Sequence, residues 1–223
     1  MSLRFFVFII FISLFAIEKT YSQMNSTILN EVQEYVSKLL LENTSEKFYY
    51  HTLKHTEEVV NAAFEISQGE NLDQDGTEIV LIAAWFHDVG YTQKIKGHEE
   101  ISAMFASNFL LDKNYPSGKI DSVIACIMST KVPQKPNSLL QKIICDADLH
   151  HLGKETFFER NELFKKELEA TQNKKQIEVE FIANTIAFMN EHQFFTNYSR
   201  KFYQPIKGKN IELLKEKLNS LLK

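Results

Sequence analysis

The sequence predicts an all-α protein, and three observations lead to that prediction. Glycine and proline are scarce, with seven and four copies in 223 residues, so the chain has few of the turns that a many-stranded protein needs. Apolar residues recur at helical spacing in nearly every segment, as in 120–128, where they follow i, i+3, i+4, i+7 and i+8. The one Asp-Gly pair, at 75–76, lies between polar residues and so does not predict a hairpin.

At least seven helices and no convincing strand are expected along the chain. Apolar stripes at helical spacing predict helices over 59–64, 101–109, 120–128, 139–144, 177–189 and 211–221. Asn137 or Ser138 is expected to cap the helix that follows the proline-containing loop 130–138. No internal repeat or linker divides the chain, so one compact helical domain is expected from residue 24 to residue 223.

The run 79–86 is ambiguous by periodicity alone, because eight consecutive apolar residues suit a buried strand as well as a buried helix. Its flanks favour a helix. Asp75 followed by Glu78 resembles a capping box with Asp in place of Ser or Thr, and the Val-Gly pair at 89–90 supplies a C-terminal stop. A helix that is apolar on every side belongs in the middle of a bundle. Its C-terminal end is expected to open toward a cavity.

Residues 1–22 differ from the rest of the chain. Arg4 precedes a 13-residue apolar stretch, residues 5–17, and small residues follow at Thr20 and Ser22. This pattern is typical of a secretory signal peptide, and the stretch is short for a membrane span, which needs about 20 residues. An exported protein, periplasmic or secreted, is therefore expected, with an uncleaved membrane anchor as the alternative.

The charge balance excludes one large class of partners. With 25 basic and 29 acidic residues the net charge is −4, so the chain lacks the basic excess that a binder of duplex nucleic acid needs. The two cysteines, Cys126 and Cys145, lie among apolar residues at helical spacing. They are expected to be buried and unpaired, in preference to forming a disulfide.

Three segments place histidine and aspartate next to apolar stripes. YYHTLKHTEEVV, FHDVGY and ICDADLHHLG begin at residues 49, 86 and 144. Their acids and imidazoles are expected to be at least partly buried, and an uncompensated buried carboxylate is costly unless it is paired or binds a metal. A divalent cation would explain why acids lie at the end of a core helix, because the cation neutralises them.

Two imidazoles and two carboxylates would form a mixed nitrogen and oxygen site. Adjacent residues on a helix point about 100° apart, but at a helix end, where the last turn loosens, His87 and Asp88 can both reach one ion. Such a set suits Mn²⁺, Fe²⁺, Co²⁺ or Mg²⁺ better than the thiolate-rich sets of structural zinc. A bound cation lowers the pKa of its water and supplies the hydroxide that phosphoester hydrolysis requires.

The order of His55, the pair His87-Asp88 and Asp148 resembles the H…HD…D signature of the HD-domain superfamily of metal-dependent phosphohydrolases. Five segments are similar to one branch of this superfamily, the small predicted HD phosphohydrolases. They are YHTLKHTEEVV, AAWFHDVGY, GHEEISA, DADLHHLG and HQFFT. The resemblance runs from about residue 48 to residue 215 and is specific, because five segments fall in the right order. It implies an all-α HD-domain bundle, which agrees with the periodicity.

By that resemblance His55, His87, Asp88 and Asp148 are the metal ligands. Asp88 would also orient the attacking water, so His87 and Asp88 are the catalytic candidates. Asp148 matches the family's position better than Asp146, which is left as a supporting or structural acid.

His98 is the next candidate, as a ligand to a second metal or as a contact to the substrate phosphate, and the alternative is an ordinary residue at a helix start. Binuclear HD phosphodiesterases resemble one another in carrying further histidines before the last Asp. This chain has Thr130-Lys131 where such enzymes often have one, which argues against a two-metal site. Lys131, with Lys94 and Lys96, could neutralise phosphate charge from nearby loops.

The other histidines are expected in supporting roles. His51 is expected to pack against the site or to support a ligand, one of the adjacent pair His150 and His151 is expected to face the cavity, and His192 is expected to support the bundle.

The expected function is hydrolysis of a phosphomonoester or phosphodiester, with a nucleotide among the candidates, by a metal-activated water. The alternatives are an HD-type non-heme iron oxygenase and a non-catalytic binding protein whose metal only stabilises the fold. The expected partner is a small phosphorylated substrate, with a membrane only if the N-terminal segment stays uncleaved. A homodimer is compatible with the 18 phenylalanines.

Overall fold

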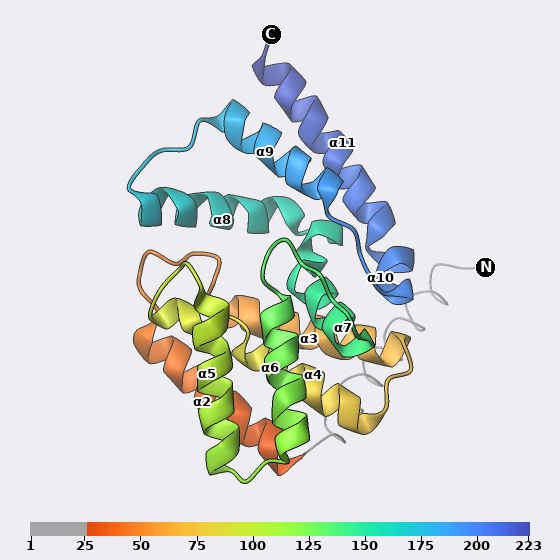
Figure 1. Cartoon of the computed structure of the whole chain (residues 1–223). Helices are drawn as coiled ribbons and strands as arrows, with labels where there is room; N and C mark the ends of the chain where they lie inside the picture. The colour runs from red at the N-terminus through yellow and green to blue at the C-terminus, as the bar shows by residue number, and fades with distance from the viewer. Residues whose placement is uncertain (1–25) are drawn as a thin grey trace, which may run out of the picture.

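The computed structural model describes residues 26–223, which form an all-α protein (Figure 1). The helices are α2 (Thr27–Asn43), α3 (Leu53–Gly69), α4 (Gln74–Phe86), η1 (Val89–Thr92), α5 (His98–Asp112), α6 (Ser117–Ser129), α7 (Leu139–Asp148), η2 (His150–Gly153), α8 (Phe157–Gln172), α9 (Glu178–Glu191), α10 (Asn197–Phe202) and α11 (Gln204–Leu221). No strand occurs within residues 26–223, which confirms the predicted fold class.

The predicted export signal at 1–22 lies outside the described residues. Among the helices of residues 26–223, none is long and apolar enough to cross a membrane.

Helix α4 forms the centre of the larger part of the bundle. Every residue of its segment 79–86 is buried, and it contacts α2, α3, α5, α6 and α7. The prediction that this apolar helix lies in the middle of the bundle is therefore confirmed. Asp88, just beyond its C-terminal end, lines a cavity, as expected, whereas His87 is buried and does not line it.

Both ends of α4 differ from the prediction. Asp73 caps the helix, because its carboxylate accepts a hydrogen bond from the Gly76 N–H at 2.7 Å. The predicted capping box is wrong, since Asp75 lies inside the first turn, where its charge suits the helix dipole. At the other end α4 stops at Phe86, and 89–92 form a separate 3₁₀ turn. Several acids and turn residues lie near each end, and only the folded backbone selects among them.

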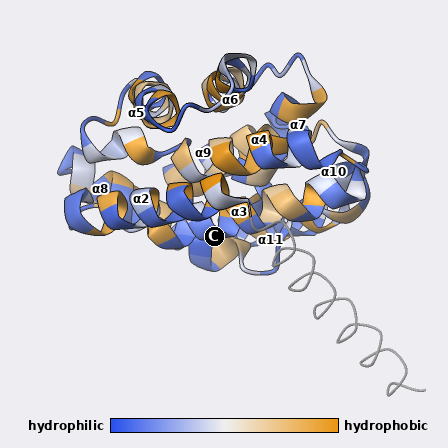
Figure 2. Ribbon diagram, turned by 90° about the horizontal axis from the view of Figure 1, so that it is seen from below, coloured by the Kyte–Doolittle hydropathy of each residue, from blue (hydrophilic) through white to orange (hydrophobic). Residues whose placement is uncertain are grey.

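Each of the surrounding helices buries one face. Figure 2 shows that most of these helices carry both hydrophobic and hydrophilic residues. Ser138 caps α7, as one of the two predicted candidates, and its hydroxyl accepts from the Gln141 N–H at 3.3 Å. Cys126 and Cys145 are both buried and unpaired, which confirms that prediction too.

Helices α8, α9 and α11 lie together on one side of this bundle (Figure 1). Helix α11 packs on α9 and on η2, and α10 contacts both α11 and α3. Lys207 of α11 is buried and donates to the His192 carbonyl at 2.6 Å, so His192 supports the bundle as expected.

Asp146 of α7 ties this group of helices to the central bundle. Its fully buried carboxylate accepts from the Phe195 N–H at 2.8 Å, the Thr196 N–H at 2.9 Å and the Thr196 hydroxyl at 2.6 Å. These bonds fix the loop between α9 and α10 two residues from Asp148. The structure thus gives Asp146 the structural position that was expected for it.

Candidate metal centre

The four residues predicted as metal ligands meet beside a cavity. His55 lies in the first turn of α3, His87 is the C-cap of α4, and Asp148 ends α7. One nitrogen or oxygen atom from each of these three lies within 4.8 Å of the other two. Asp88 adds its Oδ2 at 3.1 Å from His87 Nε2 and 3.4 Å from His55 Nε2.

Because helix α4 ends at Phe86, the two adjacent residues His87 and Asp88 can share this centre. His87 keeps helical angles, whereas Asp88 has a φ of −109° and a ψ of 4°. The changed backbone direction brings the Asp88 carboxylate next to the His87 ring, as the loosened helix end was expected to do. Gly90 follows where the chain passes the start of α5, and a Cβ at Gly90 would lie 2.0 Å from the His98 carbonyl oxygen. Only glycine fits there.

Hydrogen bonds around the centre orient its ligands. The His87 Nδ1–H donates to the Ala84 carbonyl at 2.8 Å, so Nε2 presents a lone pair to the centre. The Gln134 amide donates to Asp148 Oδ2 at 3.3 Å, which leaves Asp148 Oδ1 at 3.6 Å from Nε2 of both His55 and His87. Metal sites commonly orient their ligands through such outer hydrogen bonds.

Three of the atoms that converge on the centre lack a hydrogen-bond partner within residues 26–223. His55 Nε2, His87 Nε2 and Asp88 Oδ2 are buried and have no hydrogen-bond partner among the described residues. Their lone pairs face one another and Asp148 Oδ1, which is unfavourable unless protons or a cation lie between them. Imidazole nitrogens with carboxylate oxygens and no thiolate suit a divalent cation such as Mn²⁺, Fe²⁺, Co²⁺ or Mg²⁺. The residues present therefore fit the predicted metal.

The pKa values at the centre reflect burial and the short distances between its charged groups. Burial lowers the pKa of His87, but the Asp88 and Asp148 charges and the hydrogen bonds outweigh it and raise this pKa to about 9. Burial raises the pKa of Asp148 to about 6 against the charge of His87. Burial holds the pKa of His55 well below its ordinary value. A proton on His87 thus occupies the place of a cation, and the two compete.

His98 lies on the other side of Asp88. Its Nε2 is 3.3 Å from Asp88 Oδ1, and its Nδ1–H donates to the Ile95 carbonyl at 3.0 Å. The His98 ring stacks on Tyr91, and Tyr91 stacks on His51, each at 4.0 Å between ring centroids. These three rings line the cavity. The structure places His98 against a predicted ligand, and its role as a substrate contact stays a prediction.

Glu167 of α8 also belongs to the site, although no sequence pattern marked it. Its buried carboxylate accepts from the backbone N–H groups of Tyr50 at 2.8 Å and His51 at 2.9 Å, and pairs with His51 Nδ1. Burial raises the pKa of Glu167, but the hydrogen bond and charge of His51 outweigh it and hold the pKa below its ordinary value. No local pattern marks this residue, because only tertiary packing brings it to His51.

The cavity beside the centre has a volume of about 550 Å³. Asp88 and Asp148 line it together with His151, whose Nδ1 lies 3.0 Å from the Tyr50 hydroxyl. His150 is absent from the cavity wall, and its Nδ1–H donates to the carbonyl of residue 147 at 2.6 Å. One of the two adjacent histidines faces the cavity, as predicted.

Lys131 does not line this cavity, although Thr130 and Val132 on either side of it do. Its ammonium donates to Glu100 at 2.6 Å on the exposed surface. Lys94 and Lys96 are also exposed and lie outside the cavity wall. The predicted contact of Lys131 with a substrate phosphate therefore has no support from its position, and it stays a prediction.

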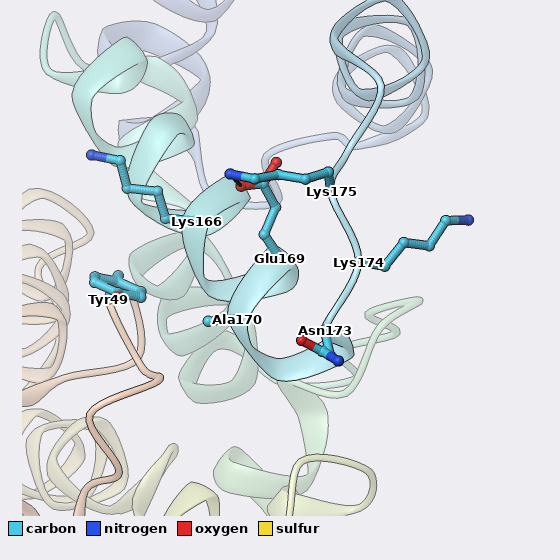
Figure 3. Close-up of a pocket in the computed structure, with 7 residues that line it drawn as sticks. All are labelled: Tyr49, Lys166, Glu169, Ala170, Asn173, Lys174 and Lys175. Atoms are coloured by element: carbon cyan, nitrogen blue, oxygen red, sulfur yellow. Dashed lines mark hydrogen bonds and ion pairs between the residues drawn. The ribbon is translucent and has the colours of Figure 1, made fainter.

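A second concavity, of about 580 Å³, lies at the C-terminal end of α8 (Figure 3). Lys175 pairs with Glu169 at 3.1 Å, whereas Lys166 and Lys174 point away from each other. The lysines do not converge on one point, and none of the residues lining this concavity lines the cavity at the centre.

Residues 52–153 match the family model of the HD domain. The four predicted ligands and His98 all lie in that range. One similar solved structure is a predicted HD superfamily hydrolase from an uncultured Thermotogales bacterium, with 21% identity, a TM-score of 0.57, and coverage of 84% of this chain and 92% of that chain.

A second similar structure is Bacillus subtilis YpgQ in complex with ADP, with 18% identity, a TM-score of 0.59, and coverage of 85% of this chain and 97% of that chain. At these identities the two structures show a shared fold. A comparison with curated protein sequences gave no match.

Proposed function

We propose that the chain is a metal-dependent phosphohydrolase of the HD superfamily that cleaves a phosphomonoester or a phosphodiester, because residues 52–153 match the HD-domain model and the fold is that of an HD superfamily hydrolase. One observation carries the proposal: His55 Nε2, His87 Nε2 and Asp88 Oδ2, all buried and unpartnered among the described residues, converge beside Asp148. A purely structural site encloses its ion, whereas this centre borders a cavity of about 550 Å³ with room for a substrate.

His55, His87, Asp88 and Asp148 would hold the cation. When bound there, a divalent cation supplies a Lewis acid for a phosphoryl oxygen and lowers the pKa of a water molecule. The two oxygens of Asp88 face different groups, Oδ2 toward the imidazoles and Oδ1 toward His98. Asp88 would therefore both bind the ion and orient the attacking water.

His51 is placed to give a proton to the leaving group. Glu167 holds its Nδ1, while its Nε2 has no hydrogen-bond partner within residues 26–223 and its ring lines the cavity with Asp88 and Asp148. An imidazole oriented by a carboxylate can hold a proton on its free nitrogen and release it to an oxygen within hydrogen-bond reach. An alkoxide leaving group needs that proton as its bond to phosphorus breaks.

The two alternatives gain less from the structure. A di-iron oxygenase needs two adjoining sets of ligands, whereas residues 26–223 contain one group of His and Asp side chains compact enough to hold a metal. A binding protein with a purely structural metal needs an enclosed site, and this centre borders a cavity. Hydrolysis explains both the ligand set and the adjoining space.

Replacing Asp88 by Ala tests the proposal. We expect bound metal and turnover to be lost together while the helical circular-dichroism signal is kept. Elemental analysis would measure the metal, and phosphate or p-nitrophenol release with added Mn²⁺, Mg²⁺, Co²⁺ or Fe²⁺ would measure turnover. Asp121→Ala, an exposed change on α6, is the matched control and should keep both. Full turnover by a folded, metal-free Asp88→Ala protein would contradict the proposal.

We also propose that the protein is exported, on the strength of the pattern in residues 1–22. N-terminal sequencing of protein from the culture medium or periplasm should then begin at Gln23. An intact N-terminus in the membrane fraction would instead support the anchor. An exported enzyme would act on phosphate esters outside the cytoplasm.

A further inference from the structure

We infer that the substrate is a phosphomonoester whose organic group is uncharged and carries a flat ring with polar edges, and that α8 and α9 select this group. The inference rests on the proposed function and names the substrate class for the same cavity. The chemistry of the cavity wall carries it.

Helices α8 and α9 supply one side of the cavity. Asn161 and Phe164 lie three residues apart on α8, and Phe181, Asn184 and Phe188 follow i, i+3 and i+7 on α9. Each set therefore lies on one face of its helix. All five residues come after residue 153, where the match to the HD domain ends. The metal centre and this side of the cavity thus come from different parts of the chain.

The phenylalanines offer flat apolar surface next to the proposed proton donor. The Phe164 ring centroid lies 6.2 Å from that of His51, so a group in contact with Phe164 is close to the imidazole that would protonate it. Phe181 is buried, whereas 37% of Phe188 is exposed. Aromatic rings gain most from flat partners at ring-centroid separations of about 4.5–7 Å. The leaving group of the substrate is therefore expected to carry a ring.

The asparagines would contact the edges of such a ring. The side-chain amides of Asn161 and Asn184 line the cavity and have no hydrogen-bond partner among the described residues. An amide offers both donors and an acceptor, which suits a ring with nitrogen and oxygen atoms at its edge. A purely hydrocarbon ring would displace water from these amides without replacing its hydrogen bonds.

Charge limits the substrate to a single phosphate. Within residues 26–223 no lysine or arginine lines the cavity, and its acidic lining groups are Asp88, Glu99 and Asp148. One phosphate can lie at the metal centre beside the histidines. Further phosphates would extend toward amide and phenyl groups, where no cation compensates for their lost hydration. The lysines at the end of α8 lie around the separate concavity of Figure 3.

Binding of three matched compounds tests the inference: adenosine 5′-monophosphate, adenosine 5′-triphosphate and ribose 5-phosphate. The first pair differs in phosphate number, and the first and third differ in the ring. Calorimetry on the metal-loaded protein should show the monophosphate binding at least about tenfold more tightly than either of the others. Tighter binding of the triphosphate, or equal binding of the monophosphate and ribose 5-phosphate, would overturn the inference.

Two variants of α9 assign the selection to its residues. Asn184→Leu should weaken binding of the monophosphate about tenfold, because one polar contact is lost. Asn190→Leu changes the same residue type on the same helix outside the cavity and should leave binding unchanged. Equal affinity of both variants and the unaltered protein would overturn the role of α9.

Phosphate release from the same samples separates this inference from the proposed function. Selective binding of the monophosphate without hydrolysis under any added cation would refute the phosphohydrolase and support the selective cavity. Hydrolysis of all three compounds with equal efficiency would support the phosphohydrolase and overturn the selectivity.

Discussion

His51 lies four residues before His55, ahead of the start of α3, and its two ring nitrogens have different surroundings. Nδ1 pairs with Glu167, and the ring faces the cavity that Asp88 and Asp148 also line. A side chain held in this way can transfer a proton without reorganising. His51, which the sequence marked only as packing or support, is therefore the residue that we propose as the proton donor.

Replacing His51 by Ala should slow hydrolysis of an alkyl phosphate about 10²–10⁴-fold, the usual contribution of general acid catalysis. Hydrolysis of p-nitrophenyl phosphate should fall less than about tenfold, because p-nitrophenolate leaves without a proton. Metal content should be unchanged, since His51 is not among the predicted ligands. Steady-state rates on both esters, with elemental analysis of the variant, check this. Equal losses on the two esters would rule out the role.

The sequence predicted the metal ligands and missed their supports, for a physical reason. Polar residues that adjoin apolar stripes marked three segments, because such residues need compensation once buried, and the resemblance to the HD signature selected His55, His87, Asp88 and Asp148 among them. Glu167 carries no such local mark, because α8 contains acids and lysines along its length. The amides that line the cavity from α8 and α9 were missed for the same reason, since single asparagines are common on helix surfaces.

The short turn η1 joins α4 to α5 through Gly90, whose backbone passes close to His98. The Gly90 N–H also donates to the Ser102 hydroxyl at 2.8 Å. These contacts set the distance between Asp88, which precedes the turn, and His98, which begins α5. The Val-Gly pair that was predicted to stop a helix thus positions two groups of the site.

Gly90→Ala should lower both thermal stability and turnover, because the added Cβ would lie 2.0 Å from a backbone oxygen and force η1 away from α5. The destabilisation should be on the order of 1–3 kcal/mol, typical of overpacking. Gly118→Ala on α6 is the matched control: nothing lies within 4 Å of its Cβ, so it should be neutral or stabilising by up to about 1 kcal/mol. Comparable melting curves for the two variants would contradict this account of the turn.

Asp146 is expected to be the main link between α7 and the loop before α10. Asp146→Ala leaves the N–H groups of Phe195 and Thr196 buried without a partner, and should reduce the free energy of unfolding by about 2–4 kcal/mol. Urea unfolding measures the change, with Asp121→Ala as a control expected to lie within about 0.5 kcal/mol of the unaltered protein. An Asp146→Ala protein as stable as that control would show that the link contributes nothing.

At the scale of elements, the predicted helical segments matched seven of the helices, did not include α2, α8 or α10, and located helix ends poorly. The all-apolar segment 79–86 was correctly placed at the centre of the bundle, because burial on every side leaves a clear pattern. The cap at Asp73 was missed, since Asp73 and Asp75 are equally suited to capping in sequence alone. Backbone geometry, which the sequence does not display, decides between them.

In the whole molecule, two parts of the chain form the site. Residues 52–153 contain the predicted metal ligands, and α8 and α9 complete the cavity. Folding brings the ligands together from three separate helices, so the unfolded chain has no formed site. Metal binding is therefore expected to stabilise the fold.

Adding Mn²⁺ at about 100 times its dissociation constant should raise the free energy of unfolding by about 2.7 kcal/mol, and a chelator should reverse the increase. Because a bound cation would displace a proton from His87, whose pKa is raised to about 9, the increase at a fixed Mn²⁺ concentration should grow as the pH rises from about 6 to about 9. Asp148→Asn should abolish it. Thermal unfolding with and without Mn²⁺ provides the measurement, and identical curves for the unaltered protein would contradict a metal site.

The most direct test of the central claim combines metal content and hydrolysis in one preparation of the purified protein. Elemental analysis should find about one equivalent of a divalent metal, and a chelator should remove both the metal and phosphate release, with activity restored by Mn²⁺, Co²⁺, Fe²⁺ or Mg²⁺. Protein that binds none of these cations, although folded, would show that the convergence of His55, His87, Asp88 and Asp148 is not a metal centre.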